Sequence, residues 1–145
     1  MSATRFAWPA EVLEEPEGTT VTFPDVPGAI TWGATRAEAM ERAADALVSV
    51  FSALIEDGKP VPSPSDPQGR PAVSIGPLDA AKVALHNAML EAKMSNVELA
   101  RRMNTDEKAV RRMRDPLHGG RIEKLVAALR ILGKRVETAV LDEVS

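Results

Sequence analysis

The chain has 145 residues, no cysteine and no apolar run near the roughly 20 residues of a membrane-spanning helix, which excludes disulfides, thiolate metal sites and a membrane partner. Its start lacks a basic segment followed by an apolar run, so we expect no signal peptide and a cytoplasmic location. The net charge of −3 is unevenly distributed between the two halves of the chain. Residues 1–78 have five basic and eleven acidic side chains, whereas residues 79–145 have thirteen and ten, which indicates one acidic half and one that suits phosphates.

The first half of the chain has the pattern of a small sheet. Phe6–Val12 and Thr19–Phe23 are predicted strands, and the polar segment Glu14–Gly18 is the predicted turn between them. Pro27-Gly28 fits the centre of a type II turn, because proline presets φ and glycine accepts a positive φ. A third strand, Ala29–Gly33, is predicted to follow this turn.

A long amphipathic helix is predicted after the strands. Thr35 and Glu38 have the spacing of a capping box, and apolar residues at helical spacing continue to about Asp57. A proline-rich connection then leads to a short fourth strand, Ala72–Ile75. This order predicts an α+β domain over residues 1–77, with the helix on one face of the sheet.

The second half, residues 78–145, is predicted to be a helical domain. Its first helix is expected to begin at the N-cap Asp79. The four expected helices span Asp79–Lys93, Ser95–Met103, Thr105–Arg114 and Ile122–Leu132. The tail Arg135–Val144 is predicted as a strand that would supply a dimer contact.

The middle two helices of this half have the pattern of a helix-turn-helix. Ser95 and Glu98 form a capping box, Asn104 can take the left-handed conformation of a tight turn, and Thr105 is the predicted N-cap of the second helix. That second helix has a cluster of basic side chains. The layout resembles the lambda-repressor type of module and indicates binding in the DNA major groove, and because one module binds weakly, we expect a homodimer on a two-fold operator.

The candidate DNA contacts lie on and around the second helix of this pair. The residues assigned to the interface are Ser95, Thr105, Glu107, Lys108, Arg111, Arg112, Arg114 and Arg121. Arg111 or Arg112 could donate two hydrogen bonds to guanine, whereas Lys108, Arg114 and Arg121 are expected on phosphates. Glu107 either stabilises the helix dipole or accepts a hydrogen bond from cytosine. A merely solvated helix face is the alternative explanation for the arginines.

A series of short motifs runs through the first half in a fixed order. They are Phe23-Pro24-Asp25, Pro27-Gly28, Gly33-Ala34-Thr35 and Glu38-Ala39, within the run VTFPDVPGAITWGATRAEAMERAADAL. This run resembles the signature of HicB-type antitoxins, and the later segment GRIEKLVAALRILGKRVE resembles the helix-turn-helix module of many members. The resemblance covers nearly the whole chain. One departure is Ala29, where the family often has cysteine, and this small apolar exchange leaves the expected fold unchanged.

The resemblance implies a degenerate ribonuclease-H-like β-β-β-α-β domain that binds and masks a small ribonuclease toxin of the HicA type. A toxin that holds RNA must be basic, so an acidic domain could dock on it by charge complementarity. The residues assigned to this toxin contact are Asp25, Trp32, Glu38, Glu41 and Asp45. A core or dimer-interface position for Trp32 and a solvated face for the acids are the alternatives.

Catalysis is not expected. Ribonuclease-H chemistry needs several carboxylates that converge on two divalent metals, and the predicted strands offer no such set. His86 and His118 are far apart in the sequence, so neither a nucleophile–base pair nor a histidine metal site is supported. We therefore expect no catalytic residue, no metal and no cofactor.

Two functions follow from the sequence. The first is an antitoxin that neutralises a ribonuclease toxin and represses its own operon through the second domain. The second is a stand-alone transcriptional regulator whose first domain binds a small ligand or only dimerises. A short neighbouring reading frame that encodes a small basic protein would favour the antitoxin.

Overall fold

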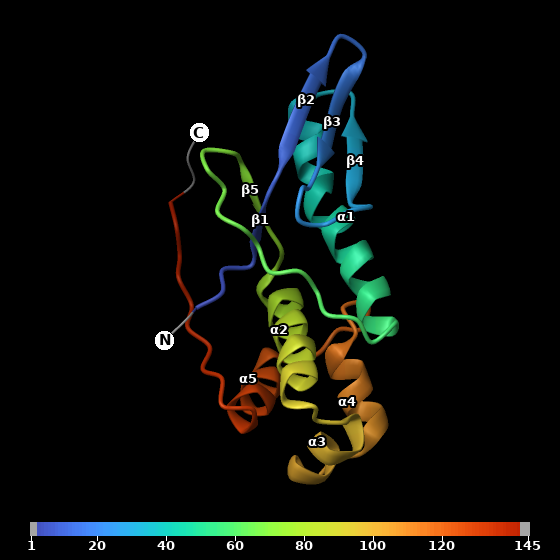
Figure 1. Cartoon of the computed structure of the whole chain (residues 1–145), viewed down its shortest axis with the longest axis vertical. Helices are drawn as coiled ribbons and strands as arrows, with labels where there is room; N and C mark the ends of the chain where they lie inside the picture. The colour runs from blue at the N-terminus through green and yellow to red at the C-terminus, as the bar shows by residue number, and fades with distance from the viewer. Residues whose placement is uncertain (1–2, 143–145) are drawn as a thin grey trace.

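A computed structural model describes residues 3–142 and confirms the α+β class. The strands are β1 (Ala7–Pro9), β2 (Glu11–Glu15), β3 (Gly18–Thr22), β4 (Ile30–Gly33) and β5 (Ala72–Ser74). The helices are α1 (Arg36–Glu56), α2 (Pro77–Ala92), α3 (Asn96–Arg102), α4 (Glu107–Arg114) and α5 (Ile122–Ile131). The strands β2, β3 and β4 and the helix α1 lie at one end of the molecule and α3–α5 at the other, with α2 between them (Figure 1). No helix within residues 3–142 is both long enough and apolar enough to span a membrane.

The predicted first strand is divided in two. β2, β3 and β4 form an antiparallel three-stranded sheet, whereas β1 pairs with β5 in a separate two-stranded sheet. Ala10 lies between β1 and β2, and its amide donates to the Pro71 carbonyl at 2.8 Å. The prediction of one continuous strand over Phe6–Val12 was therefore wrong, because its two ends pair with different partners. The hairpin turn is also shorter than predicted, since β2 runs to Glu15 and β3 begins at Gly18.

The turn and the helix of the first half match their predictions, except that the Glu38 carboxylate accepts from the Ala34 amide at 3.1 Å and not from the Thr35 amide, as a capping box requires. The Ala29 amide donates to the Val26 carbonyl at 3.1 Å and Gly28 has φ of 93°, as a type II turn requires. The Thr35 hydroxyl accepts from the Glu38 amide at 3.2 Å and caps α1. The buried stripe of α1 consists of Ala39, Ala43, Leu47 and Phe51. This stripe packs on the inner face of the sheet, so burial of one helix face holds the two layers together.

The helical half begins two residues earlier than predicted. Gly76 is the N-cap of α2 and Pro77 occupies the first turn, where its missing amide hydrogen costs nothing and its fixed φ suits a helix. Asp79 therefore lies in the first turn, where its charge faces the positive end of the helix dipole, and the prediction that it caps the helix was wrong. Val83 of α2 packs in the first core, whereas Leu85 packs in the second. α2 thus contributes to both cores.

The tail after α5 has no regular structure over residues 135–142. No strand within residues 3–142 pairs with this segment, so the predicted strand does not form within one chain. Its predicted contact with a second copy stays a prediction. The end of the predicted strand, Val144, lies outside the described residues.

Candidate functional site

The α3–turn–α4 pair has the N-cap Ser95 and the turn that the sequence predicts, but only half of the predicted capping box. The Ser95 hydroxyl accepts from the Glu98 amide at 3.1 Å. The Glu98 carboxylate does not return to Ser95 but accepts hydrogen bonds from Arg101 and Arg102, and these bonds lower its pKa to about 2. Asn104 has φ of 57°, which confirms its predicted left-handed conformation. The turn between the helices is therefore fixed by backbone conformation as well as by packing.

Asp106, not Thr105, caps the second helix. The Asp106 carboxylate accepts from the Ala109 amide at 2.8 Å, and its backbone is extended. Thr105 instead belongs to the end of the preceding helix, because its amide donates to the Ala100 carbonyl at 2.9 Å. The predicted N-cap was wrong by one residue. The turn after α3 includes Thr105, since the Thr105 amide bonds back to α3. Asp106 is therefore the first residue whose backbone is extended and whose side chain can accept a hydrogen bond from an amide of α4.

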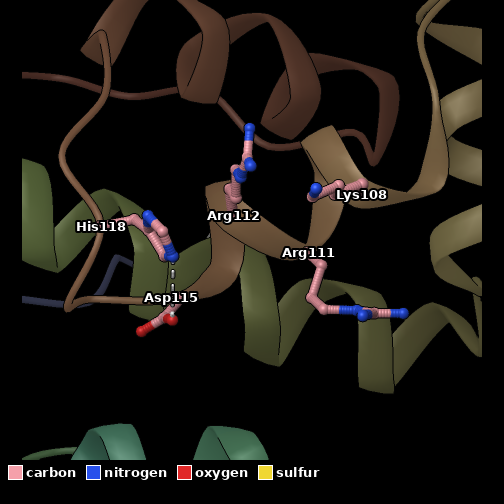
Figure 2. A pocket seen from close by; sticks show the side chains of 5 residues that line it. All are labelled: Lys108, Arg111, Arg112, Asp115 and His118. Carbon is pink, nitrogen blue, oxygen red and sulfur yellow. Dashed lines mark ion pairs between the residues drawn. The ribbon is translucent and has the colours of Figure 1, made fainter.

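A shallow basic hollow lies beside α4. Its volume is about 190 Å³, and Lys108, Arg111, Arg112, Asp115 and His118 line it (Figure 2). Lys108 and Arg112 are one turn apart, both are exposed, and neither forms an ion pair within residues 3–142. The His118 ring faces Asp115, with Nε2 3.9 Å from the carboxylate. This row of α4 therefore offers two cations that are free to meet a polyanion.

Arg111 extends from α4 in a direction opposite to Arg112 (Figure 2). Its guanidinium donates to both carboxylate oxygens of Glu107, each at 2.8 Å. The same carboxylate accepts from the side-chain Nδ2 of Asn96 at 3.3 Å, and the Arg111 and Asn96 bonds both lower the pKa of Glu107. The Glu107 carboxylate therefore already accepts hydrogen bonds from Arg111 and Asn96 in the absence of DNA. This geometry favours a role in holding the Arg111 side chain over a contact with cytosine.

His86 lies at the junction of the two halves and is fully buried. Its Nε2 is 2.8 Å from the Lys59 carbonyl, in the segment after α1, and its Nδ1 is 2.7 Å from the Arg114 guanidinium on α4. Since a carbonyl only accepts and a guanidinium only donates, we assign the neutral ring with its proton on Nε2. Burial lowers the pKa of His86, the bond to the Lys59 carbonyl opposes this shift, and Arg114 adds to it.

Arg114 has internal partners instead of the predicted exposed position. Besides the bond to His86, its guanidinium donates to the Asn96 side-chain oxygen at 2.7 Å, and the residue is half-buried. Two side chains therefore already fix Arg114, which leaves it poorly placed for the phosphate contact expected from the sequence. It links α2, the start of α3 and the end of α4.

A buried lysine anchors the same end of α4. Lys82 is 1% exposed, and its ammonium donates to the Arg112 carbonyl at 2.8 Å. Burial lowers the pKa of Lys82, while Asp115 and Asp79 act to raise it. The Arg112 carbonyl also accepts from the Asp115 amide at 3.2 Å, so Lys82 adds a second donor at the end of α4, where a cation suits the helix dipole. Lys82 and His86 were missed as sites; the available signal was two polar residues one turn apart inside the apolar stripe of α2.

The remaining predicted DNA contacts stay exposed. Ser95 is at the start of α3, and Arg121 occupies the N-cap position of α5 without a side-chain cap. They lie on separate helices from Lys108 and Arg112. Their place in an interface therefore depends on how a duplex would lie across the module.

The five residues assigned to a protein contact in the first half do not form one surface. Trp32 lies on β4 and is 50% exposed, whereas Glu41 and Asp45 lie on the exposed side of α1, which covers the other face of the sheet. Glu38 is paired with Arg42 at 2.7 Å. Asp25 holds the proline-rich connection, since its carboxylate accepts from the amide and hydroxyl of Ser65 at 2.8 and 2.9 Å. The described residues contain no group of three acidic or histidine side chains that could hold a metal ion.

Comparison with known proteins extends over both halves of the chain. A sequence model described as "HicB_like antitoxin of bacterial toxin-antitoxin system" matches residues 7–84. Antitoxin HicB 2 of Photorhabdus laumondii is 38% identical over 134 residues, which cover 92% of this chain and 96% of that protein. Antitoxin HicB of Escherichia coli is 35% identical over 136 residues, with coverage of 92% and 99%. Antitoxin HicB of Pseudomonas fluorescens is 33% identical over 137 residues, with coverage of 93% and 94%.

Proposed function

Because the chain belongs to the HicB-like antitoxin family, we propose that it neutralises a small ribonuclease toxin of the HicA type and represses its own operon. The first half would bind the toxin, and the second half would bind operator DNA as a helix-turn-helix module. The single observation that carries the proposal is the similarity to antitoxins along nearly the whole chain, through both halves. The acidic charge of residues 1–78 supports contact with a basic protein.

Two features of the second half support DNA binding. Lys108 and Arg112 lie on one row of α4 and have no carboxylate partner within residues 3–142, so no ion pair seen there must be broken when phosphates approach. Lys82 and Arg114 hold α4 against its neighbours, which fixes the helix in one position before binding. A homodimer on a two-fold operator would place two such helices one turn of DNA apart.

Arg111 and Arg112 are expected to play different parts. Arg112 has no ion-pair partner within residues 3–142 and can donate both arms to guanine, whereas Arg111 must leave Glu107 or contact DNA with that carboxylate still attached. Arg112→Ala should therefore weaken recognition of the operator more than Arg111→Ala. Loss of one good bidentate contact is expected to cost about 1–3 kcal/mol of discrimination.

Growth and gel-shift assays test the two activities separately. Co-expression with the product of the adjacent short reading frame should restore growth that this product alone arrests. The double variant Arg111→Ala, Arg112→Ala should lose binding to the upstream DNA at fixed salt and keep the growth rescue. Arg36→Ala, an exposed ion-paired arginine of the first half, is the matched control. Failure of the unaltered protein to rescue growth would refute the antitoxin role, and operator binding by the double variant would refute this recognition helix.

A further inference from the structure

One face of the three-stranded sheet is exposed and apolar. Side chains alternate along a strand, and the register β2–β3–β4 aligns Leu13 with Thr20 and Thr20 with Trp32 in one row across the sheet. Ile30 lies in the next row, on the same face. Leu13, Ile30 and Trp32 are 58%, 61% and 50% exposed, while α1 covers the opposite face. We call this surface, with Leu13, Thr20, Ile30 and Trp32, the outer sheet face.

Trp32 is held in position on the β4 side of this surface. A Cβ atom at Gly18 would lie 2.4 Å from Cζ2 of Trp32, so the indole lies directly against the backbone of β3 and only glycine fits beneath it. A half-exposed tryptophan that is already fixed loses little conformational entropy when a partner covers it. Rigid aromatic side chains of this kind are typical anchors of protein interfaces.

Both edges of the sheet disfavour addition of a further strand. On β4, the Trp32 carbonyl already accepts from Arg42 of α1 at 3.0 Å. On β2, the edge has Glu11, Glu14 and Glu15, and charged side chains on an edge strand oppose pairing with another chain. A partner would therefore pack on the outer sheet face and not extend the sheet.

Acidic side chains lie along the β2 side of the apolar patch. Glu11 and Glu15 lie on the same face of β2 as Leu13, and Glu17 lies in the hairpin turn beside them. Glu11 has Arg70 at 3.6 Å, whereas Glu15 and Glu17 form no ion pair within residues 3–142. An apolar patch with acidic side chains along one side fits a basic protein. A second copy of this chain would add its own carboxylates to the interface, and like charges at an interface are unfavourable.

We infer that the outer sheet face is the docking surface for a small basic protein, with Trp32 as its anchor and Leu13 and Ile30 beside it. This inference rests on the proposed function and names the surface that would bind the ribonuclease toxin. Of the five residues predicted from the sequence, it keeps Trp32 and leaves out Glu41 and Asp45, which lie on the other side of the domain. Glu15 and Glu17 replace them as the acidic contacts.

Binding measurements on the full-length protein test this surface. The probe is the inactivated product of the adjacent short reading frame, titrated into the unaltered protein and into variants. Trp32→Ala should weaken binding about 30-fold or more, as removal of an interface anchor does. The double variant Leu13→Thr, Ile30→Thr keeps residues that favour strands and should also weaken binding. The double variant Glu15→Lys, Glu17→Lys should weaken binding most at low salt, since exposed charge attraction is screened.

The control variant is Glu41→Ala, Asp45→Ala, on the exposed side of α1, and it should bind as the unaltered protein does. Circular dichroism and thermal melting of each variant separate loss of binding from loss of fold. Binding that the outer-face variants retain would overturn the inference and leave the antitoxin role intact. If the outer-face variants lose self-association but still bind the probe, the inference is overturned, and the outer sheet face is instead an interface with a second copy of this chain. No binding by the unaltered protein would instead refute the proposed function, and the inference with it.

Discussion

The two halves of the molecule use polar side chains in opposite ways. Among the described residues of the first half, the buried core is apolar except for Thr19, and the ion pairs lie on the surface, as between Arg36 and Glu14. In the second half Lys82 and His86 are buried, and both contact α4. α4 has eight residues and only Val110 is fully buried, so apolar packing holds this helix weakly. The hydrogen bonds from Lys82 and His86 of α2 fix the position of α4, because the short apolar stripe of α4 is not sufficient to do so.

The comparison has a functional side as well. The first half exposes apolar side chains on a rigid sheet, which suits a protein partner. The second half exposes cations on a helix whose position buried polar groups determine, which suits a nucleic acid. Four experiments test how separate the two arrangements are, beginning with the largest expected effect.

Truncation of one core should test whether the halves unfold together. Phe51 is fully buried, its ring centroid is 4.7 Å from that of Trp8, and Phe51→Ala should cost about 3–5 kcal/mol. Leu125→Ala in the other core should cost about 2–5 kcal/mol. Calorimetry of both variants should give one shared transition, because α2 packs in both cores. Two transitions, only one of them shifted in each variant, would show that the halves fold independently.

Removal of the junction histidine should have the next largest effect. His86→Ala leaves the Lys59 carbonyl and part of the half-buried Arg114 guanidinium without partners, so the free energy of unfolding should fall by about 2–3 kcal/mol. Urea denaturation measures the change. His118→Ala, at an exposed position beside Asp115, is the control and should change stability little. Equal effects of the two substitutions would contradict a structural role for the buried chain of hydrogen bonds.

The caps of the helix pair provide a smaller test. Asp106→Ala should destabilise the protein by about 1 kcal/mol, because the Ala109 amide loses its acceptor. Thr105→Ala should have almost no effect, since that side chain caps nothing. Thermal melting at neutral pH compares the two variants. A larger loss for Thr105→Ala would place the cap where the sequence alone suggested it.

The pH dependence of His86 should be the smallest effect. Its pKa is lowered in the folded state, so the unfolded chain binds the proton more tightly, and stability is full above pH 6.5 and falls as pH decreases below it. The groups that face the ring are the Arg114 guanidinium and the Lys59 carbonyl, and protonation would place two donors against each other. This one group should contribute a loss of at most about 0.7 kcal/mol between pH 7 and pH 6. The loss should be absent in His86→Ala, and an identical pH profile in that variant would contradict this origin.

The sequence was sufficient for most local structure. Capping residues, turn residues and the spacing of apolar side chains act over a few residues, so the type II turn, α1 and the α3–α4 pair could be predicted. The errors lie where two local signals competed. The helix α2 begins at Pro77 and not after Asp79, and Thr105 belongs to the turn after α3 and does not cap α4. The break at Ala10 was not predictable locally, because it arises from pairing with β5, some sixty residues away.

The site was less predictable than the fold for the same reason. Arg111, Arg112 and Arg114 look equivalent in the sequence, yet one is paired with Glu107, one has no ion-pair partner within residues 3–142 and one is fixed to His86. A helical period gives the direction of a side chain relative to its own helix axis. It does not give the neighbours that the side chain will meet.

The sequence by itself determined the family, the α+β class, the division of charge and the presence of a helix pair with basic residues. The tertiary structure decided which cations lack an ion-pair partner among the described residues, and it set Trp32 on a sheet face apart from the acids of α1. The physical reason is the range of the interactions. Caps, turns and periodicity depend on residues close in sequence, whereas burial and hydrogen-bond partners depend on which distant segments pack together.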